Sequence, residues 1–190
     1  MNKVTFYDTE TTGLPDWKTP SGRENQPHLV QITAIQCNED TEEILQRIDL
    51  IIKPIGWDIP QVVVDIHGID KEKALDCGVW EPAAVGMLLE LCNDSIRVAH
   101  NRTFDQRIIR IALKRYEDNE TIDKWAEKDD HLCTMLSGKD AMGVKKWPNL
   151  KEALKFFTGK ELINAHSSIA DTEACMEIYF AMKKADATFR

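Results

Sequence analysis

Residues 4–10 are the most constraining stretch of the chain, because a strand-like apolar run there ends in two carboxylates. Side chains of a strand alternate between two faces, so Phe6, Asp8 and Glu10 point the same way. An apolar face that ends in two negative charges is costly unless a cation meets them. A hard divalent metal ion with oxygen ligands would meet that need. Taken alone, the pair is equally compatible with Asp8 simply capping the loop at residues 9–13.

Size and charge set the class of protein. The chain has 190 residues, of which 43% are hydrophobic, so we expect residues 1–190 to form one domain with a full core. It carries 24 Lys and Arg against 32 Asp and Glu, a formal net charge of −8. An acidic total does not exclude a nucleic-acid substrate, since divalent cations at a carboxylate site change the local field. It does predict weak, salt-sensitive binding of such a substrate.

Cysteine usage and the absence of long apolar runs indicate the compartment. The five cysteines form no CxxC pair, which favours buried free thiols in a reducing environment over a disulfide or zinc framework. Asp8 comes too early to leave room for a signal peptide. No apolar run approaches the roughly 20 residues of a membrane-spanning helix. We therefore expect a cytoplasmic protein with no membrane partner.

The order of predicted elements favours an α/β fold. Turn-forming and polar residues at 15–28 predict a long exposed loop, and residues 55–70 predict an irregular connection with a short helix. Three strands come first, and later strands alternate with helices, which indicates a mixed central sheet. Strands are expected at residues 4–7, 29–37, 47–53, 95–99 and 131–135, and helices near 82–92, 103–116, 150–157 and 168–184.

Two of the predicted helices carry one acid each at the start of an apolar stripe. Asp105 heads a stripe through Ile108 and Ala112, and Asp171 heads one through Cys175 and Ile178. Alone, each acid would more often be a first-turn residue favoured by the helix dipole. That alternative places the acid on a solvent face, which neither occupies. Four carboxylates cannot share a site without cations, and a centre with two metal ions for in-line phosphoryl displacement fits them.

One of the five histidines is a candidate for catalysis, and none indicates a zinc site. His166 lies five residues before Asp171, and its ordinary pKa of about 6.5 suits a general base. A surface or helix-capping role is the alternative for His166. No histidine and cysteine spacing supports zinc. The other histidines are expected to be structural: His67 and His100 satisfying backbone groups in turns, and His28 and His131 exposed or partly buried.

Four segments together resemble the DEDDh family of 3′-to-5′ exonucleases, which includes polymerase proofreading subunits and RNase T. They are FYDTETTGLP, IPQVVVDIHGI, VAHNRTFD and HSSIAD, in this order along the chain. The last matches the His-x4-Asp pattern, with Ser167 where related enzymes have Tyr and Ser168 where Ala is common. The resemblance implies an RNase H-like fold, a five-stranded mixed sheet flanked by helices with strand two antiparallel.

The same resemblance implies a mechanism and a set of site residues. Asp8, Glu10, Asp105 and Asp171 would hold two Mg²⁺ or Mn²⁺ ions, and His166 would be the general base. The product would be 5′-mononucleotides, released from a nucleic acid with a free 3′ end. Single-stranded DNA is the expected substrate. The expected substrate contacts are Thr11, Leu14, Asn101 and Phe104, although Leu14 could instead fold back on the core and Phe104 could serve core packing.

Two basic groups could grip the substrate or could be solvated helix faces. One consists of Lys139, Lys145, Lys146, Lys151, Lys155 and Lys160 around Trp147, and the other of Arg102, Arg107, Arg110, Lys114 and Arg115. Alternatives to a DNA exonuclease are an enzyme that trims RNA 3′ ends, a catalytically silent nucleic-acid-binding module, and a structural protein with acidic caps. The sequence does not specify the oligomeric state.

Overall fold

A central mixed sheet organises the protein, and the computed structural model describes residues 2–127, 131–163 and 167–189. The strand order is β3-β2-β1-β4-β5. β2 runs antiparallel to both β1 and β3, whereas β4 runs parallel to β1 and β5. The predicted five-stranded α/β sheet with an antiparallel second strand is confirmed. The strands are β1 (Lys3–Thr11), β2 (Leu29–Asn38), β3 (Ile44–Ile51), β4 (Ile96–Ala99) and β5 (His131–Cys133).

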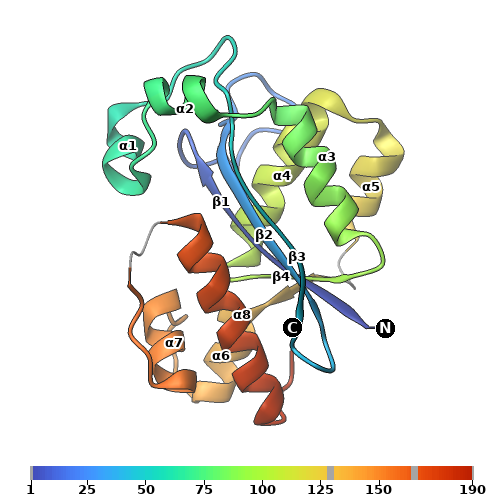
Figure 1. The fold of residues 1–190 in the computed structure, drawn as a ribbon, viewed down its shortest axis with the longest axis vertical. Helices are drawn as coiled ribbons and strands as arrows, with labels where there is room; N and C mark the ends of the chain where they lie inside the picture. The colour runs from blue at the N-terminus through green and yellow to red at the C-terminus, as the bar shows by residue number, and fades with distance from the viewer. Residues whose placement is uncertain (1, 128–130, 164–166, 190) are drawn as a thin grey trace.

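Helices cover both faces of this sheet (Figure 1). α3, α4 and α5 pack on one face, and α8 packs on the other with α6 and α7 beside it. The short helices α1 and α2 lie past one end of the sheet in Figure 1. The described helices are α1 (Gln61–His67), α2 (Lys71–Cys77), α3 (Glu81–Cys92), α4 (Arg102–Tyr116), α5 (Asn119–Ala126), α6 (Thr134–Met142), α7 (Leu150–Thr158) and α8 (Ser168–Lys184).

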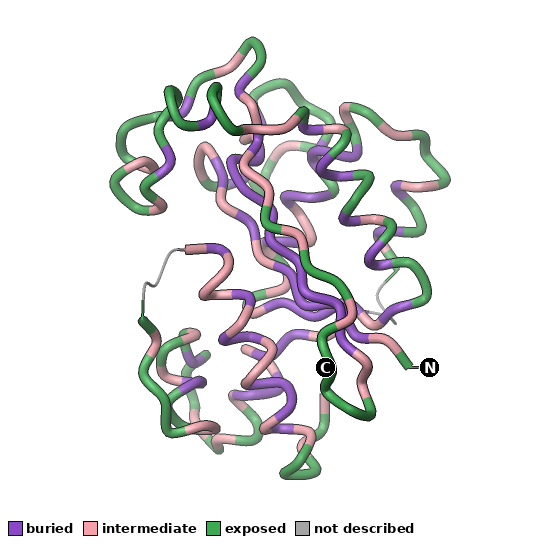
Figure 2. The backbone as a smooth tube through the Cα atoms, viewed as in Figure 1, coloured by how far each residue is buried: buried purple, intermediate pink, exposed green. Residues whose placement is uncertain are grey.

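β1 is the strand on which both layers meet, and the sheet is buried through its middle (Figure 2). Phe6 contacts the rings of Tyr179 and Phe180 edge-on, with centroids 5.3 and 5.6 Å apart. Tyr7, on the opposite face, meets Trp125 at 5.7 Å. Because both faces are packed, a shift of register by one residue would expose one aromatic set. This packing fixes the direction in which the residues at the end of β1 point.

Several expectations from the sequence differ from the structure. The strand expected over residues 131–135 ends at Cys133, because its parallel partner β4 ends at Ala99, which pairs with Cys133. The chain then enters α6, which was not predicted, and neither were α2 and α5. Four of the five cysteines are buried and free, but Cys77 is exposed. No helix in the described part of the chain combines the length and apolarity that crossing a membrane requires.

The loop at residues 15–28 is held more tightly than its composition predicts. The side chain of Gln26 is 2% exposed and donates to the carbonyls of Asp16 and Thr19, at 2.9 and 3.2 Å. Arg115 of α4 donates to the carbonyl of Gln26 at 2.9 Å. The expectation of an exposed loop is therefore wrong for Pro15, Ser21 and Gln26, which are buried. The Gln26 amide holds the loop together, and Arg115 ties it to α4.

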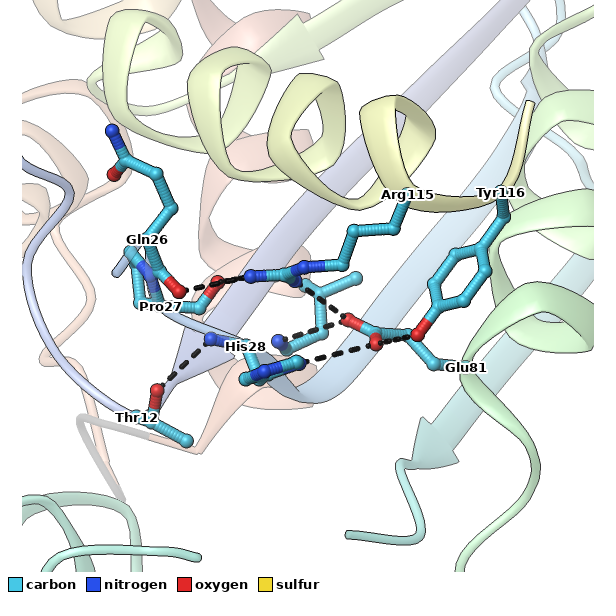
Figure 3. Close-up of polar contacts among 8 residues, drawn as sticks. Thr12, Gln26, Pro27, His28, Glu81, Arg115 and Tyr116 are labelled. Carbon is cyan, nitrogen blue, oxygen red and sulfur yellow. Dashed lines mark hydrogen bonds and ion pairs between the residues drawn. The ribbon is translucent and has the colours of Figure 1, made fainter. Parts of the chain in front are cut away.

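A buried carboxylate joins this loop to α3 and α4 (Figure 3). Glu81 is 2% exposed and accepts a hydrogen bond from the Tyr116 hydroxyl at 2.7 Å. Arg115 lies 3.5 Å from it and the Nδ1 atom of His28 lies 3.4 Å away. Burial alone would raise the pKa of Glu81, but hydrogen bonds with His28 and Tyr116 and the charge of Arg115 lower it below its ordinary value.

We expect Glu81→Gln to lower the free energy of unfolding at pH 7 by about 3 kcal/mol, because it leaves Arg115 partly buried without its counter-charge. The folded-state pKa of Glu81 is depressed. Its stabilisation is therefore present above the unfolded-state pKa of about 4.3 and is lost as the pH falls through the folded-state pKa.

Urea unfolding at pH 7 and pH 3 measures both effects, and the difference between wild type and Glu81→Gln should shrink at pH 3. Glu90→Gln is the matched control, because Glu90 lies on the same helix and is exposed. Equal losses for the two variants would contradict the role of the buried carboxylate.

Candidate functional site

Three carboxylates meet where β1 ends beside the start of α8. Asp8 and Glu10 come from β1 and Asp171 from α8, and each offers one oxygen within 4.8 Å of the others. The Ser168 hydroxyl donates to the backbone carbonyl of Asp8 at 3.1 Å, which ties the first turn of α8 to the strand. Among the residues that the structure describes, this is the group of acidic, histidine and cysteine side chains that could hold a metal ion.

The charge of this cluster is unfavourable in the absence of a cation. Burial, followed by the negative charge of Asp171, raises the pKa of Asp8 to about 7. Burial, followed by the charges of Asp8 and Asp171, raises the pKa of Glu10 to about 8. Hard oxygen ligands crowded in this way are the donor set that Mg²⁺, Mn²⁺ and Ca²⁺ prefer. The donor chemistry therefore fits a divalent metal ion, as the sequence predicts.

Asp105 approaches the same place from α4, on the other face of the sheet. It is 3% exposed, and its Oδ1 atom accepts hydrogen bonds from the Thr9 amide at 3.1 Å and the Thr9 hydroxyl at 2.8 Å. Burial, followed by the charge of Asp8, raises its pKa well above the ordinary value. Asp105 is not one of the three acids whose oxygens lie within 4.8 Å of one another, but it lines the same cavity.

A cavity of about 240 Å³ brings all four predicted acids together. The turn between β4 and α4 forms one wall, and Asn101 takes a left-handed conformation there, with φ 61° and ψ 44°. Two of the four predicted substrate contacts, Asn101 and Phe104, line this cavity. Its lining residues are Asp8, Thr9, Glu10, His100, Asn101, Phe104, Asp105, Leu150 and Asp171.

The other two predicted substrate contacts lie outside the cavity wall. The Thr11 side chain is 7% exposed, and its hydroxyl donates to the carbonyl of Gly13 at 2.8 Å. Leu14 is 83% exposed, so the alternative that it folds back on the core is wrong. His166 lies outside the described residues, which resume at Ser167, so its role as a base stays a prediction.

His100 and Leu150 line the cavity, and neither was singled out as a site residue from the sequence. His100 was expected to satisfy backbone groups, and its Nε2 atom lies 3.2 Å from the carbonyl of Pro148. Burial lowers its pKa to about 4, so the imidazole is neutral near pH 7. Its place directly after β4 and before Asn101 was the available signal, because strand ends gather at one edge of a sheet.

The remaining histidines have structural surroundings. The Nδ1 atom of His67 accepts from the Ile69 amide at 3.1 Å, as expected of a turn residue. The expectation that His131 is exposed or partly buried is wrong, since it is 1% exposed and meets Trp125 edge-on at 4.9 Å. Burial lowers the pKa of His131 to about 3.

Comparison with known proteins places this geometry in a family. A family model described as Exonuclease matches residues 5–179 of the chain. Ribonuclease T of Haemophilus ducreyi is 28% identical over 192 residues, which span 93% of this chain and 83% of that protein. DNA polymerase III PolC-type of Streptococcus mutans is 30% identical over 123 residues, which span 62% of this chain and 7% of that protein.

Solved structures share the fold. Exonuclease I of E. coli in complex with a dT13 oligonucleotide aligns with a TM-score of 0.75 and 20% identity, over 96% of this chain. The zinc-bound form of the E. coli ExoI–ssDNA complex aligns with a TM-score of 0.76 and 21% identity, over 97% of this chain. In both cases the chain spans 41% of the length of that protein.

A divalent metal ion should stabilise the protein through these acids. We expect Mn²⁺ to raise the melting temperature, by an amount equivalent to about 2.7 kcal/mol at a hundred times its Kd. Asp8→Asn should remove most of this gain and leave the metal-free protein at least as stable as wild type, because a crowded, partly buried charge is lost. Thermal melting with Mn²⁺ and with EDTA measures both effects.

Asp76→Asn is the control for this experiment, since Asp76 is exposed and should respond to Mn²⁺ as wild type does. A wild-type melting temperature that Mn²⁺ does not change would refute the metal role of the cluster.

Proposed function

The chain belongs to the exonuclease family that matches residues 5–179, and from this premise we propose that it removes 5′-mononucleotides from single-stranded DNA with two divalent metal ions. It is a 3′-to-5′ exonuclease of the DEDDh type. The observation that carries the metal proposal is the approach of Asp8, Glu10 and Asp171 to within 4.8 Å in a cavity that Asp105 also lines. We also propose that residues 1–190 form one exonuclease domain.

The four carboxylates have the chemistry to bind the ions. Asp8, Glu10 and Asp171 supply close oxygens, and Asp105 completes the set from the opposite face of the sheet. When bound, the ions supply Lewis-acid polarisation of the scissile phosphate and neutralise the charge that develops in its transition state. Thr9 holds Asp105 with two hydrogen bonds, so little reorientation of this side chain is needed during the reaction.

His166 is the proposed general base, which takes a proton from the attacking water. It precedes Ser167 and Ser168 in the sequence, and Ser168 is bonded to the backbone of Asp8. An ordinary histidine pKa of about 6.5 gives a neutral imidazole over much of the range near pH 7. His100 is less suited to this role, because both of its ring nitrogens already have partners, Thr134 and Pro148.

The terminal nucleotide is proposed to occupy the cavity beside Asn101 and Phe104. The partly buried ring of Phe104 offers a face on which a base can stack. Leu14 is exposed on the loop that follows β1, as a side chain that wedges against the terminal base must be. The backbone of Thr11 is proposed to meet the 3′-hydroxyl.

Trimming of RNA 3′ ends is the second candidate. It is favoured by similarity to Ribonuclease T over 93% of this chain, whereas the PolC-type relative matches 62% of it. In this proposal the same site accepts the ribose of RNA and the deoxyribose of DNA, and we assign to no described residue of the cavity a role in choosing between them. Digestion of equal-length DNA and RNA oligonucleotides, labelled at either end, distinguishes the two candidates and tests the direction of degradation.

We expect Asp105→Asn to reduce turnover of a labelled DNA oligonucleotide at least a hundredfold, as loss of a preorganised charged group commonly does. The fold should be retained, since the amide oxygen of Asn can still accept from Thr9. Asp123→Asn, an exposed acid on α5, is the matched control. Turnover by Asp105→Asn at the rate of the control would exclude this carboxylate from the reaction.

His166→Ala should lower kcat by roughly 10²–10⁴, the contribution usual for a general base. Stabilisation by Mn²⁺ should be retained, because the proposed ligands are untouched. The measurements are single-turnover rates and melting temperatures, with Ser167→Ala as the neighbouring control. If kcat at pH 7 is unchanged in His166→Ala, another group takes the proton.

A further inference from the structure

The two basic groups seen in the sequence differ in how well they are neutralised. Lys146, Lys155 and Lys160 of the first group each form an ion pair with a glutamate. In the second group, Arg115 pairs with the buried Glu81, and Arg102 donates to a backbone carbonyl at 2.8 Å. These side chains are therefore partly committed to holding the fold together.

The rest of the second group faces a loop across a cavity of about 440 Å³. Arg107, Arg110 and Lys114 follow one another along α4 at offsets of three and seven residues, which places them on one face of the helix. Arg23, from the loop at residues 15–28, lines the cavity as well. The wall is completed by Pro20, Ser21 and Gly22, so no acid among the residues that the structure describes lines it.

The positive charge of this cavity is not neutralised by ion pairs in the described part of the chain. Within the described ranges, none of its four cationic side chains lies within 4.0 Å of a carboxylate. Burial and then the like charge of Arg110 lower the pKa of Arg107, against the opposing effect of Asp16. Such a concentration of cations stands out in a chain of net charge −8. A bound anion would relieve the repulsion between them.

The cavity is built from ordered contacts rather than from loose surface chains. Arg107 donates to the carbonyls of Thr19 and Asp16, at 2.6 and 3.3 Å, and so fixes the loop on α4. Gly22 lies against the aliphatic part of the Lys114 side chain. A Cβ atom added to Gly22 would lie 3.7 Å from the Cβ atom of Lys114. The hydroxyl of Ser21 is buried without a hydrogen-bond partner in the described structure, and a phosphate oxygen could accept from it.

An aromatic ring beside the cations favours a nucleic acid over other anions. Trp17 is 55% exposed, and its ring lies 5.8 Å from the guanidinium carbon of Arg107. Exposed aromatic side chains next to a basic groove are the usual elements of single-strand binding, in which bases stack and phosphates contact cations. An inorganic phosphate or an acidic peptide would make no comparable use of the ring.

The cavity lies along the helix that also forms the candidate active site. Phe104 lines the active-site cavity, and Arg107 and Lys114 are three and ten residues further along α4. At about 1.5 Å per residue, these cations lie roughly 5 to 15 Å from Phe104 along the helix axis. This axial separation is short enough for one strand to span.

We propose that the cavity lined by Arg23, Arg107, Arg110 and Lys114 binds backbone phosphates of the strand whose 3′ end is in the active site. The inference rests on the proposed function for the choice of substrate. The cavity would let the protein bind long substrates more tightly than short ones, since a di- or trinucleotide in the active site is too short to engage all four cations.

The test measures binding of a fluorescent dT20 oligonucleotide in EDTA, where no turnover occurs, over 50 to 200 mM salt. Arg110→Ala/Lys114→Ala avoids Arg107, whose loss would free the loop. The slope of log Kd against log salt should fall by about 1.4, since each phosphate contact of a single strand contributes about 0.7. The ratio of variant to wild-type Kd should then shrink about sevenfold over this salt range, and the loss should be smaller for a trinucleotide.

Lys183→Ala/Lys184→Ala is the matched control, with the same change in net charge at residues that line neither cavity. Binding by Arg110→Ala/Lys114→Ala equal to that of the control at every salt concentration would overturn the inference, whether or not the wild type degrades DNA. If the wild type degrades neither DNA nor RNA, and Arg110→Ala/Lys114→Ala still shows a salt-dependent loss of dT20 binding, the proposed function is refuted and the phosphate cavity is supported.

Discussion

The crowding of negative charge at the end of β1 is the interaction on which the rest of the site depends. Asp8 and Glu10 continue an apolar strand face that is packed under Tyr179 and Phe180, so their place at the end of that face is fixed by the core. Burial and mutual repulsion raise the pKa of Asp8 to about 7 and that of Glu10 to about 8. The folded chain therefore maintains a cluster that is unfavourable when empty and favourable with a cation. Stability of the core is what keeps the ligands together, and this is the usual relation between a rigid scaffold and a preorganised site.

Both helical layers contribute to holding this arrangement. From one side, Ser168 fixes the first turn of α8 to the backbone of Asp8, which sets the position of Asp171. From the other side, Thr9 points away from Asp8 and meets Asp105 of α4 with two hydrogen bonds. A carboxylate on each face of the sheet is thus positioned by contacts with adjacent residues of one strand. Because β1 lies in the middle of the sheet, between β2 and β4, these two positions are held rigidly.

How much of this could be read from the sequence depends on the range of each interaction. Period-two alternation predicted the common direction of Asp8 and Glu10, and the helical stripes predicted that Asp105 and Asp171 head core-facing stripes, because these are properties of local geometry. The partnership of Thr9 with Asp105 spans 96 residues and crosses the sheet, so no local pattern carries it. The same holds for α4, where Arg115 and Arg107 look alike in sequence. Arg115 pairs with Glu81 of α3, whereas Arg107 holds a loop and lines a cavity. Only the tertiary structure distinguishes an arginine that pairs with a buried acid from one that lines a basic cavity.

The acidic cluster creates a problem for a polyanionic substrate that the basic cavity on α4 can address. A strand approaching the four carboxylates meets a negative field until cations neutralise it, and the chain as a whole is acidic. Attraction must then come from a local group of uncompensated cations close enough to act within the screening length of about 8 Å at physiological salt. Arg107 satisfies this condition, since it lies about 5 Å from Phe104 along the axis of α4, and Arg110 and Lys114 extend the positive charge further along the same helix. Catalytic ligand and substrate grip would then share one rigid element, so the distance between the reacting phosphate and the held backbone would be set by the rise of a single helix.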